Sequence, residues 1–214
     1  MRLYTVGHST RSAAALIELL RMHGLDLLID VRRFPGSRRH PQFNIGHLPG
    51  VLSDSGIAYH HLEALGGRRK RRLTADESPN TGWTVEGFRS FADYAMTPAF
   101  RDALEDLLNL ARHQTAALMC AELLWWQCHR RIIGDYLLVR SVEVVHLLDS
   151  TGSSPAELTK GAEPQAEGTN PLPAGAGRPA LSGPAASQPR DNYPERATVD
   201  SDARLTDRVV MMEK

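Results

Sequence analysis

Residues 115–130 read TAALMCAELLWWQCHR, and this stretch decides the fold. Its first part, Thr115–Met119, is a short apolar run that predicts a buried strand. A second pattern begins at Cys128 and continues to Arg140, where it predicts a helix. Because a strand followed by a helix is the repeating unit of α/β proteins, the stretch indicates that class.

The same alternation extends from this stretch in both directions along the chain. Further strands are predicted at Leu3–Val6, Leu27–Val31, Ile57–Tyr59 and Val142–Leu147. Helices are predicted at Ser12–His23, Pro49–Ser55, Val85–Met96 and Pro98–His113. Strands separated by helices imply a mostly parallel sheet, here of about five strands, flanked by helices.

The composition of the chain changes near Ser150, beyond which Pro, Gly and Ala dominate. Such a stretch cannot bury enough apolar surface to offset the entropy lost on ordering. We therefore expect one α/β domain at residues 1–150, followed by a flexible, disordered tail at residues 151–214. The apolar residues within 204–214 could dock as a short helix or strand, although a frayed terminus is the simpler expectation.

Composition limits the compartment and the partners. The chain has 25 basic and 25 acidic residues, so its net charge does not direct it to nucleic acid or to a membrane. Two cysteines are too few for a disulfide framework, and the opening MRLYTVGH has no signal-peptide core. No apolar run approaches the roughly 18 residues that would span a bilayer. We expect a cytoplasmic protein with reduced thiols and no membrane partner, whose cofactor and oligomeric state the sequence leaves unknown.

Polar and reactive side chains follow each predicted strand at the point where it ends. They are Gly7-His8-Ser9-Thr10, Arg32-Arg33, His60-His61 and Cys120-Ala121-Glu122. In open parallel sheets, ligands bind beyond the carboxyl ends of the strands. We therefore expect residues far apart in the chain to converge on one crevice at that edge.

The pattern Cys120-x-Glu122-x5-Cys128-His129-Arg130 carries the strongest chemical signal. Cys128 and His129 are expected at the start of a helix, where exposed N–H groups and the helix dipole favour a thiolate or a bound anion. One of the cysteines would act as a nucleophile or redox thiol, with Glu122 or His129 as proton carriers. Arg130 would hold a substrate oxyanion. Both cysteines could instead be small buried residues.

Two further segments are predicted to contribute to the same site. His8 is expected to face the crevice that Cys120 faces and is a third candidate for proton transfer, while Ser9 and Thr10 could present hydroxyls to an anion or simply cap the helix that follows. The arginine-rich loop is predicted to add three more substrate-binding residues, namely Arg32, Ser37 and Arg38. Guanidinium groups clamp phosphate or carboxylate through paired hydrogen bonds.

Two alternatives to an enzyme remain open. The run Arg68–Arg72 could follow a phosphate backbone and make the chain a nucleic-acid-binding module, although most such runs are simply solvated. Cys120, Cys128, His129 and His8 are acceptable zinc ligands, which would suit a metal or thiol-redox sensor. Because adjacent Cys128 and His129 need not point the same way, and no Cys-x2-Cys pair is present, we assign no metal ligands from sequence.

The motifs resemble a bacterial and archaeal family known as domain of unknown function 488. The matching pieces are Gly7-His8-Ser9-Thr10, Ile29-Asp30-Val31-Arg32, Pro35-x-Ser37-Arg38, Gln42-Phe43-Asn44, Gly56-Ile57-x-Tyr59, Leu65-Gly66-Gly67, Met119-Cys120-x-Glu122 and Cys128-His129-Arg130. They cover nearly all of residues 1–148 in the right order. The resemblance implies a compact α/β domain and no established reaction. The residues themselves favour an enzyme that acts on an anionic substrate, such as a nucleotide or a nucleic-acid component.

Overall fold

The computed structural model describes residues 1–70, 73–74, 76–150, 152–165 and 208–211. The strands are β1 (Arg2–Gly7), β2 (Leu27–Asp30), β3 (Ala58–His61), β4 (Ala116–Cys120), β5 (Glu143–Leu147), β6 (Ser153–Pro155), β7 (Ala162–Gln165) and β8 (Arg208–Met211). The α-helices are α1 (Ala13–Met22), α2 (Leu48–Ser53), α3 (Glu86–Ala95), α4 (Pro98–Leu110) and α5 (Arg130–Val139). Short 3-10 helices lie at Pro41–Phe43, Glu63–Leu65, Ala111–His113 and Trp125–Gln127. Every predicted strand and helix is therefore present, with ends shifted by one or two residues in most cases.

Six strands form the main sheet, in the order β3-β2-β4-β1-β5-β6. The first five are parallel, and β6 adds an antiparallel edge next to β5. The prediction of a mostly parallel sheet flanked by helices is confirmed, with one strand more than expected. That strand forms because the chain turns back after β5, where the N–H of Gly152 donates to Asp149 Oδ1 at 2.7 Å.

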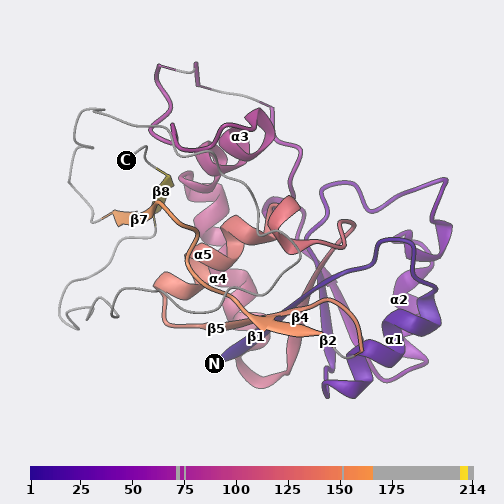
Figure 1. Cartoon of the computed structure of the whole chain (residues 1–214). Coiled ribbons are helices and arrows are strands. Elements are labelled where there is room, and N and C mark those ends of the chain that lie inside the picture. The colour runs from indigo at the N-terminus through magenta and orange to yellow at the C-terminus, as the bar shows by residue number, and fades with distance from the viewer. Residues whose placement is uncertain (71–72, 75, 151, 166–207, 212–214) are drawn as a thin grey trace.

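Helices cover both faces of the sheet, which explains why the central strands are mostly apolar on both faces (Figure 1). One face packs against α1 and α2, and its core includes Val6, Leu28 and Met119. The other face packs against α3, α4 and α5, and its core includes Ile29 and Leu118. Strand residues alternate between these two layers because successive side chains point to opposite faces.

The strand order reverses between β1 and β4. After β1 the chain crosses through α1 to β2, on one side of this pair, whereas after β4 it crosses through α5 to β5, on the other. The connection from β1 passes β4 to reach β2 and that from β4 passes β1 to reach β5, on opposite faces of the sheet, so no single helix covers both strand ends. In doubly wound sheets such a switch point is where ligands bind.

The described structure continues beyond residue 150, where the sequence predicts the folded domain to end. Besides β6, the chain forms a small antiparallel hairpin of β7 and β8. The N–H of Met211 donates to Asn80 Oδ1, and the N–H of Gly82 donates to Met211 O, both at 3.1 Å. Val209 and Met211 are buried in the core beside α3 and α5 because β8 docks there. The rest of the predicted tail, residues 151, 166–207 and 212–214, lies outside the described residues.

Among the described helices, none combines the length and the apolar character needed to cross a bilayer.

Candidate functional site

The carboxyl ends of β1 and β4 meet at the switch point. Gly7 is paired with Cys120 in the parallel register, and the N–H of His8 donates to Cys120 O at 2.9 Å. The chain leaving β4 then passes directly over the end of β1. A Cβ atom on Gly7 would lie 1.9 Å from the carbonyl oxygen of Glu122, so no side chain fits at this position. Glycine here is what brings the two strand ends together.

Three potential ligand or nucleophile atoms gather at this point, and we call them the Cys–His cluster (Cys120, Cys128 and His129). Nδ1 of His129 lies 3.9 Å from Cys120 Sγ and 3.6 Å from Cys128 Sγ. All three atoms lie within 4.8 Å of one another. Both cysteines are buried, with exposed fractions of 7% and 2%. The predicted convergence of these residues is therefore present in the structure.

The imidazole of His129 is held in one orientation by its neighbours. Nε2 lies 2.9 Å from the carbonyl oxygen of Val31, just beyond β2. Because a carbonyl oxygen only accepts, Nε2 carries a proton and donates it, and Nδ1 is the atom that faces the sulfurs. Phe91 packs edge-on against the ring at 5.0 Å between centroids. A Cβ on Gly67 would lie 2.8 Å from Nδ1, so only glycine lets this loop close over the ring.

Arg130, the first residue of α5, is an almost completely buried cation, with 1% of its surface exposed. Its Nε donates to Cys128 Sγ at 3.3 Å, and its Nη2 donates to the carbonyl oxygens of Glu122 and Leu123. Among the described residues, no carboxylate forms an ion pair with it. Because burying a cation is costly, Arg130 favours a negative charge beside it, and the Cys128 sulfur to which it donates is one group that can carry that charge.

The two cysteines are placed in unequal surroundings. Burial opposes ionisation of Cys128, but a hydrogen bond with Cys120, the charges of His129 and Arg130, and a hydrogen bond with His129 together hold the pKa of Cys128 well below its usual value. The same hydrogen bond and burial raise the pKa of Cys120 well above its usual value. The surroundings therefore favour ionisation of Cys128 over ionisation of Cys120.

His8 and Arg32 lie together beside the Cys–His cluster. The guanidinium of Arg32 forms a buried ion pair with Asp30, whose Oδ2 also accepts from Tyr59 Oη at 2.7 Å. Arg32 Nη2 donates to Phe43 O at 2.7 Å, and Nη1 donates to His8 Nε2 at 3.2 Å. Burial and the charge of Arg32 lower the pKa of His8 to about 4, so the ring is neutral at neutral pH. The charge of Arg32 is thus balanced inside the fold.

The sequence predictions missed two residues at this edge, Arg11 and His146. Arg11 follows the His8-Ser9-Thr10 segment, and its guanidinium donates to the carbonyl oxygens of Gly7 and Leu148. His146 is buried, and Trp125 stacks on it with centroids 4.2 Å apart. Burial and the charge of Arg130 lower the pKa of His146 to about 3. Arg11 could have been found from its place after a strand end, whereas His146 lies within β5 and gave no such signal.

Other predicted site residues lie farther out. The side chains of Glu122 and Thr10 are exposed, and Ser9 is half-buried with a φ of 47°. In the arginine-rich loop, Ser37 Oγ accepts from the N–H of His40, and Arg38 is exposed. Within the described part of the chain, no hydrogen bond or ion pair joins Ser37 or Arg38 to the Cys–His cluster. Their roles in substrate binding stay predictions, as does proton transfer by Glu122.

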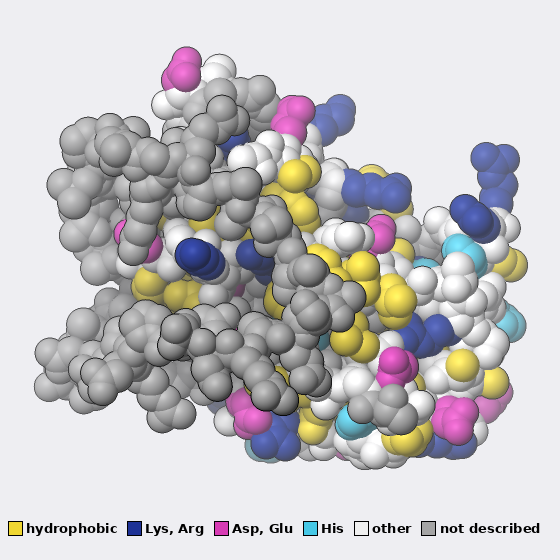
Figure 2. Space-filling view, in the orientation of Figure 1, with side chains coloured by type: hydrophobic (Ala, Val, Ile, Leu, Met, Phe, Trp, Pro, Cys, Tyr) yellow, Lys and Arg dark blue, Asp and Glu magenta, His cyan; other side chains and the backbone are white. Residues whose placement is uncertain are grey.

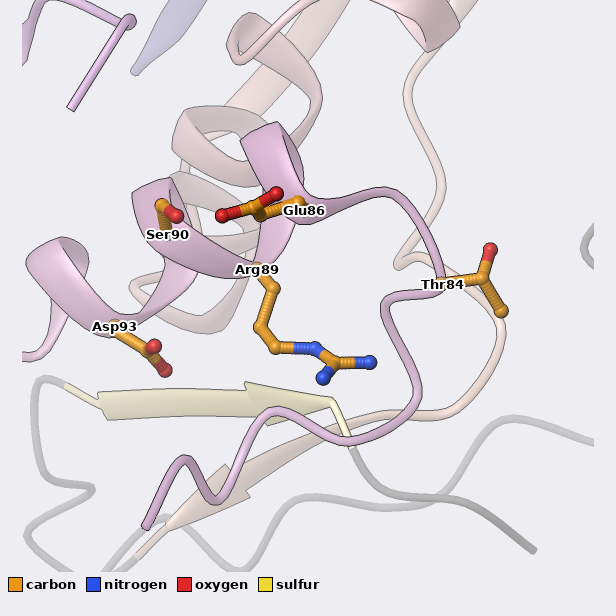
Figure 3. Close-up of a pocket in the computed structure, with 5 residues that line it drawn as sticks. All are labelled: Thr84, Glu86, Arg89, Ser90 and Asp93. Carbon is orange, nitrogen blue, oxygen red and sulfur yellow. The ribbon is translucent and has the colours of Figure 1, made fainter. Parts of the chain in front are cut away.

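The structure also has a hollow that the sequence did not predict (Figure 3). It lies along α3 and is lined by Thr84, Glu86, Arg89, Ser90 and Asp93. Asp93 accepts from Ser78 Oγ at 2.6 Å and from Asn80 Nδ2 at 2.8 Å, so its carboxylate is already satisfied within the fold. None of the lining residues belongs to the Cys–His cluster. We therefore place the candidate site at the switch point.

Comparison with protein families gives one match. The model of a domain of unknown function, DUF488, matches residues 12–137, which include the cluster, Arg32 and Arg130. Neither the comparison with curated proteins nor that with solved structures found a match. The matched range covers more than half of the chain and contains β2, β3, β4 and most of α5. The chain therefore belongs to the DUF488 family.

Proposed function

We propose that this domain is an enzyme that acts on an anionic substrate, with its reactive centre at the Cys–His cluster. The observation that carries the proposal is the convergence of Cys120, Cys128, His129 and Arg130 at the switch point of a parallel sheet. Sites of this kind collect polar groups from separate strand ends around one substrate position. The four residues come from β4, from the loop after it and from the start of α5.

The charges at this edge favour an anionic substrate over a cationic or apolar one. The guanidiniums of Arg130 and Arg11 are bonded to carbonyl oxygens and a sulfur, whereas that of Arg32 is paired with Asp30. Among the described residues Arg130 has no carboxylate partner and contacts an ionisable sulfur of the reactive centre, while the charge of Asp149 acts on Arg11. We therefore assign the attraction of the substrate to Arg130 and Arg11, and we assign to Arg32 the task of holding His8 in place.

A screen for turnover with variants tests the proposal. The purified full chain would be assayed against nucleotides, phosphate esters and short nucleic acids, together with Cys120→Ser and Cys128→Ser. We expect both substitutions to lower turnover by at least about 100-fold, the scale of removing a group that takes part in chemistry. Glu122→Gln tests whether the exposed carboxylate moves a proton.

The matched control is Arg89→Lys, at the hollow of Figure 3 rather than at the cluster. It should keep full turnover, and circular dichroism should show that every variant is folded. Turnover that survives in both cysteine variants would remove the cluster from the reaction and overturn the proposal.

A nucleic-acid-binding module has less support from the geometry. Of the basic run Arg68–Arg72, two residues lie outside the described part of the chain. Arg69 is folded back, with its guanidinium 3.8 Å from the Tyr94 ring centroid and donating to the carbonyls of Glu63, Ala64 and Gly66. On the face shown in Figure 2, the described Lys and Arg side chains lie in several small separate groups, with acidic and hydrophobic side chains between the groups.

A further inference from the structure

We infer that Cys120, Cys128 and His129 form a binding site for a thiophilic divalent cation of the zinc type. The sequence alone gives no metal site, because adjacent Cys128 and His129 need not point the same way. In the structure the two side chains do point the same way. Sγ of Cys128 and Nδ1 of His129 are 3.6 Å apart, and both face Cys120 Sγ. The inference goes beyond the proposed function, because metal binding can be measured without a substrate.

The spacing of the three atoms fits a tetrahedral metal. Zinc binds sulfur at about 2.3 Å and imidazole nitrogen at about 2.0–2.1 Å. In a tetrahedral site, a sulfur ligand and a nitrogen ligand therefore lie about 3.6 Å apart, and two sulfur ligands lie about 3.8 Å apart. The structure has sulfur–nitrogen distances of 3.6 and 3.9 Å. The two sulfurs lie within 4.8 Å of each other, so a shift of at most about 1 Å would complete the triangle around an ion of this size.

The orientation of His129 is the one that a metal ligand needs. Metal-binding histidines usually donate their second ring N–H to a carboxylate, a backbone carbonyl or a water, which fixes the ring and directs the other nitrogen at the ion. Nε2 of His129 donates to Val31 O at 2.9 Å, and Nδ1 faces both sulfurs. Gly67 and Phe91 close over the ring, so this orientation is fixed before any ion arrives.

Arg130 has the contact expected of a residue that supports a bound thiolate. Its Nε donates to Cys128 Sγ at 3.3 Å and takes no acidic partner among the described residues. Hydrogen bonds of this kind orient ligands and lower the charge density on sulfur. Arg130 is thus a positioning residue for Cys128 in the proposed site, not a ligand.

The ligand set selects the class of metal. Two cysteine sulfurs and one imidazole suit zinc and related soft or borderline cations, whereas calcium and magnesium require oxygen ligands. Three protein ligands leave the fourth tetrahedral position open, which is typical of catalytic rather than structural zinc. An anionic substrate or a water would complete the coordination, in keeping with the positive charge of Arg130.

Cobalt(II) is the probe of choice, because tetrahedral cobalt with thiolate ligands gives visible bands and a sulfur-to-metal charge-transfer band. The full chain would be purified without a histidine tag, freed of metal with a chelator and kept reduced with a phosphine. We expect one equivalent of cobalt to bind with the tetrahedral spectrum and to be displaced by zinc. Cys120→Ser and Cys128→Ser should each remove about half of the charge-transfer intensity and weaken binding by more than about 100-fold, since loss of supporting residues alone costs 10–100-fold.

His129→Asn should weaken cobalt binding to a similar degree while keeping the charge-transfer band of any ion still bound. His113→Asn, at an exposed histidine outside the cluster, is the matched control and should bind as the parent chain does. Far-ultraviolet circular dichroism would confirm that each variant is folded. Absence of a tetrahedral spectrum from the folded, reduced parent chain would overturn the inference, and so would an unchanged spectrum in both cysteine variants. Neither result depends on enzymatic turnover, so the metal site and the proposed function can fail separately.

Discussion

The buried carboxyl group of Asp135 makes the stability of the fold depend on pH. Asp135 lies on α5 with 2% of its surface exposed, and its Oδ1 accepts from the N–H of Thr159 at 2.8 Å. Burial raises the pKa of Asp135 from 3.8 to about 7, and the hydrogen bonds from Thr159 and the charge of Arg131 only partly oppose this. Folding therefore favours the protonated carboxyl group.

The sign of the effect follows from the two pKa values. Below pH 3.8 the group is protonated whether the chain is folded or unfolded, and it contributes no penalty. Between pH 3.8 and about 7 the unfolded chain releases the proton and the folded chain keeps it, so stability falls as the pH rises. At about 1.36 kcal/mol per pKa unit, the full penalty is about 4 kcal/mol above pH 7, of which about 2.5 kcal/mol develops between pH 5 and pH 8.

Asp135→Asn removes the ionisation and keeps an oxygen that can accept from Thr159. We expect the variant to gain stability relative to the parent chain by about 2.5 kcal/mol on going from pH 5 to pH 8. Urea unfolding at several pH values in this range measures the difference directly. Asp106→Asn, at an exposed aspartate of α4, is the control and should run parallel to the parent chain. A constant difference between Asp135→Asn and the parent chain from pH 5 to pH 8 would refute the reasoning.

Three further substitutions have outcomes that the packing determines. Gly67→Ala places a Cβ 2.8 Å from His129 Nδ1, so it should destabilise the fold by about 1–3 kcal/mol in urea unfolding. Its control is Gly50→Ala on α2, where the new Cβ meets open space and should not destabilise the fold. Met211→Ala removes a buried side chain of β8 and should cost about 2–5 kcal/mol, unless β8 is dispensable, in which case the melting temperature would not change. Tyr59→Phe deletes the 2.7 Å hydrogen bond to the buried Asp30 carboxylate and should cost about 1.5–3 kcal/mol by chemical denaturation; a neutral effect would mean that water replaces the hydroxyl.

Most of the fold could be predicted from the sequence because each signal was local. The run Leu27–Val31 is apolar except for Asp30, as expected of a strand covered on both faces. Ser12 caps α1 by accepting from the N–H of Ala15 at 3.1 Å. The residues after Ser150 were harder to predict. β6 and β8 have no strong pattern of their own, and they are fixed by pairing with β5 and by contacts with Asn80 and Gly82, which are distant in sequence.

The candidate site was only partly visible in the sequence, for a related reason. That Cys120 and Arg130 lie at a strand end and a helix start follows from their positions in the chain. The orientation of His129 does not, because it depends on Val31, Gly67 and Phe91, which belong to three other segments. In the same way, the ion pair of Arg32 with Asp30 depends on how the two side chains point, which their nearby positions in the sequence do not determine.

The position of β4 in the sheet has a consequence for how the protein folds. β4 enters the sheet between β1 and β2, although more than a hundred residues separate Gly7 from its partner Cys120. Such a central strand closes long chain loops when it pairs, and folding slows as contacts become more distant in sequence. Protection of the two thiols from a small alkylating reagent should therefore appear only in the slow phase of refolding, together with burial of the centre of the sheet.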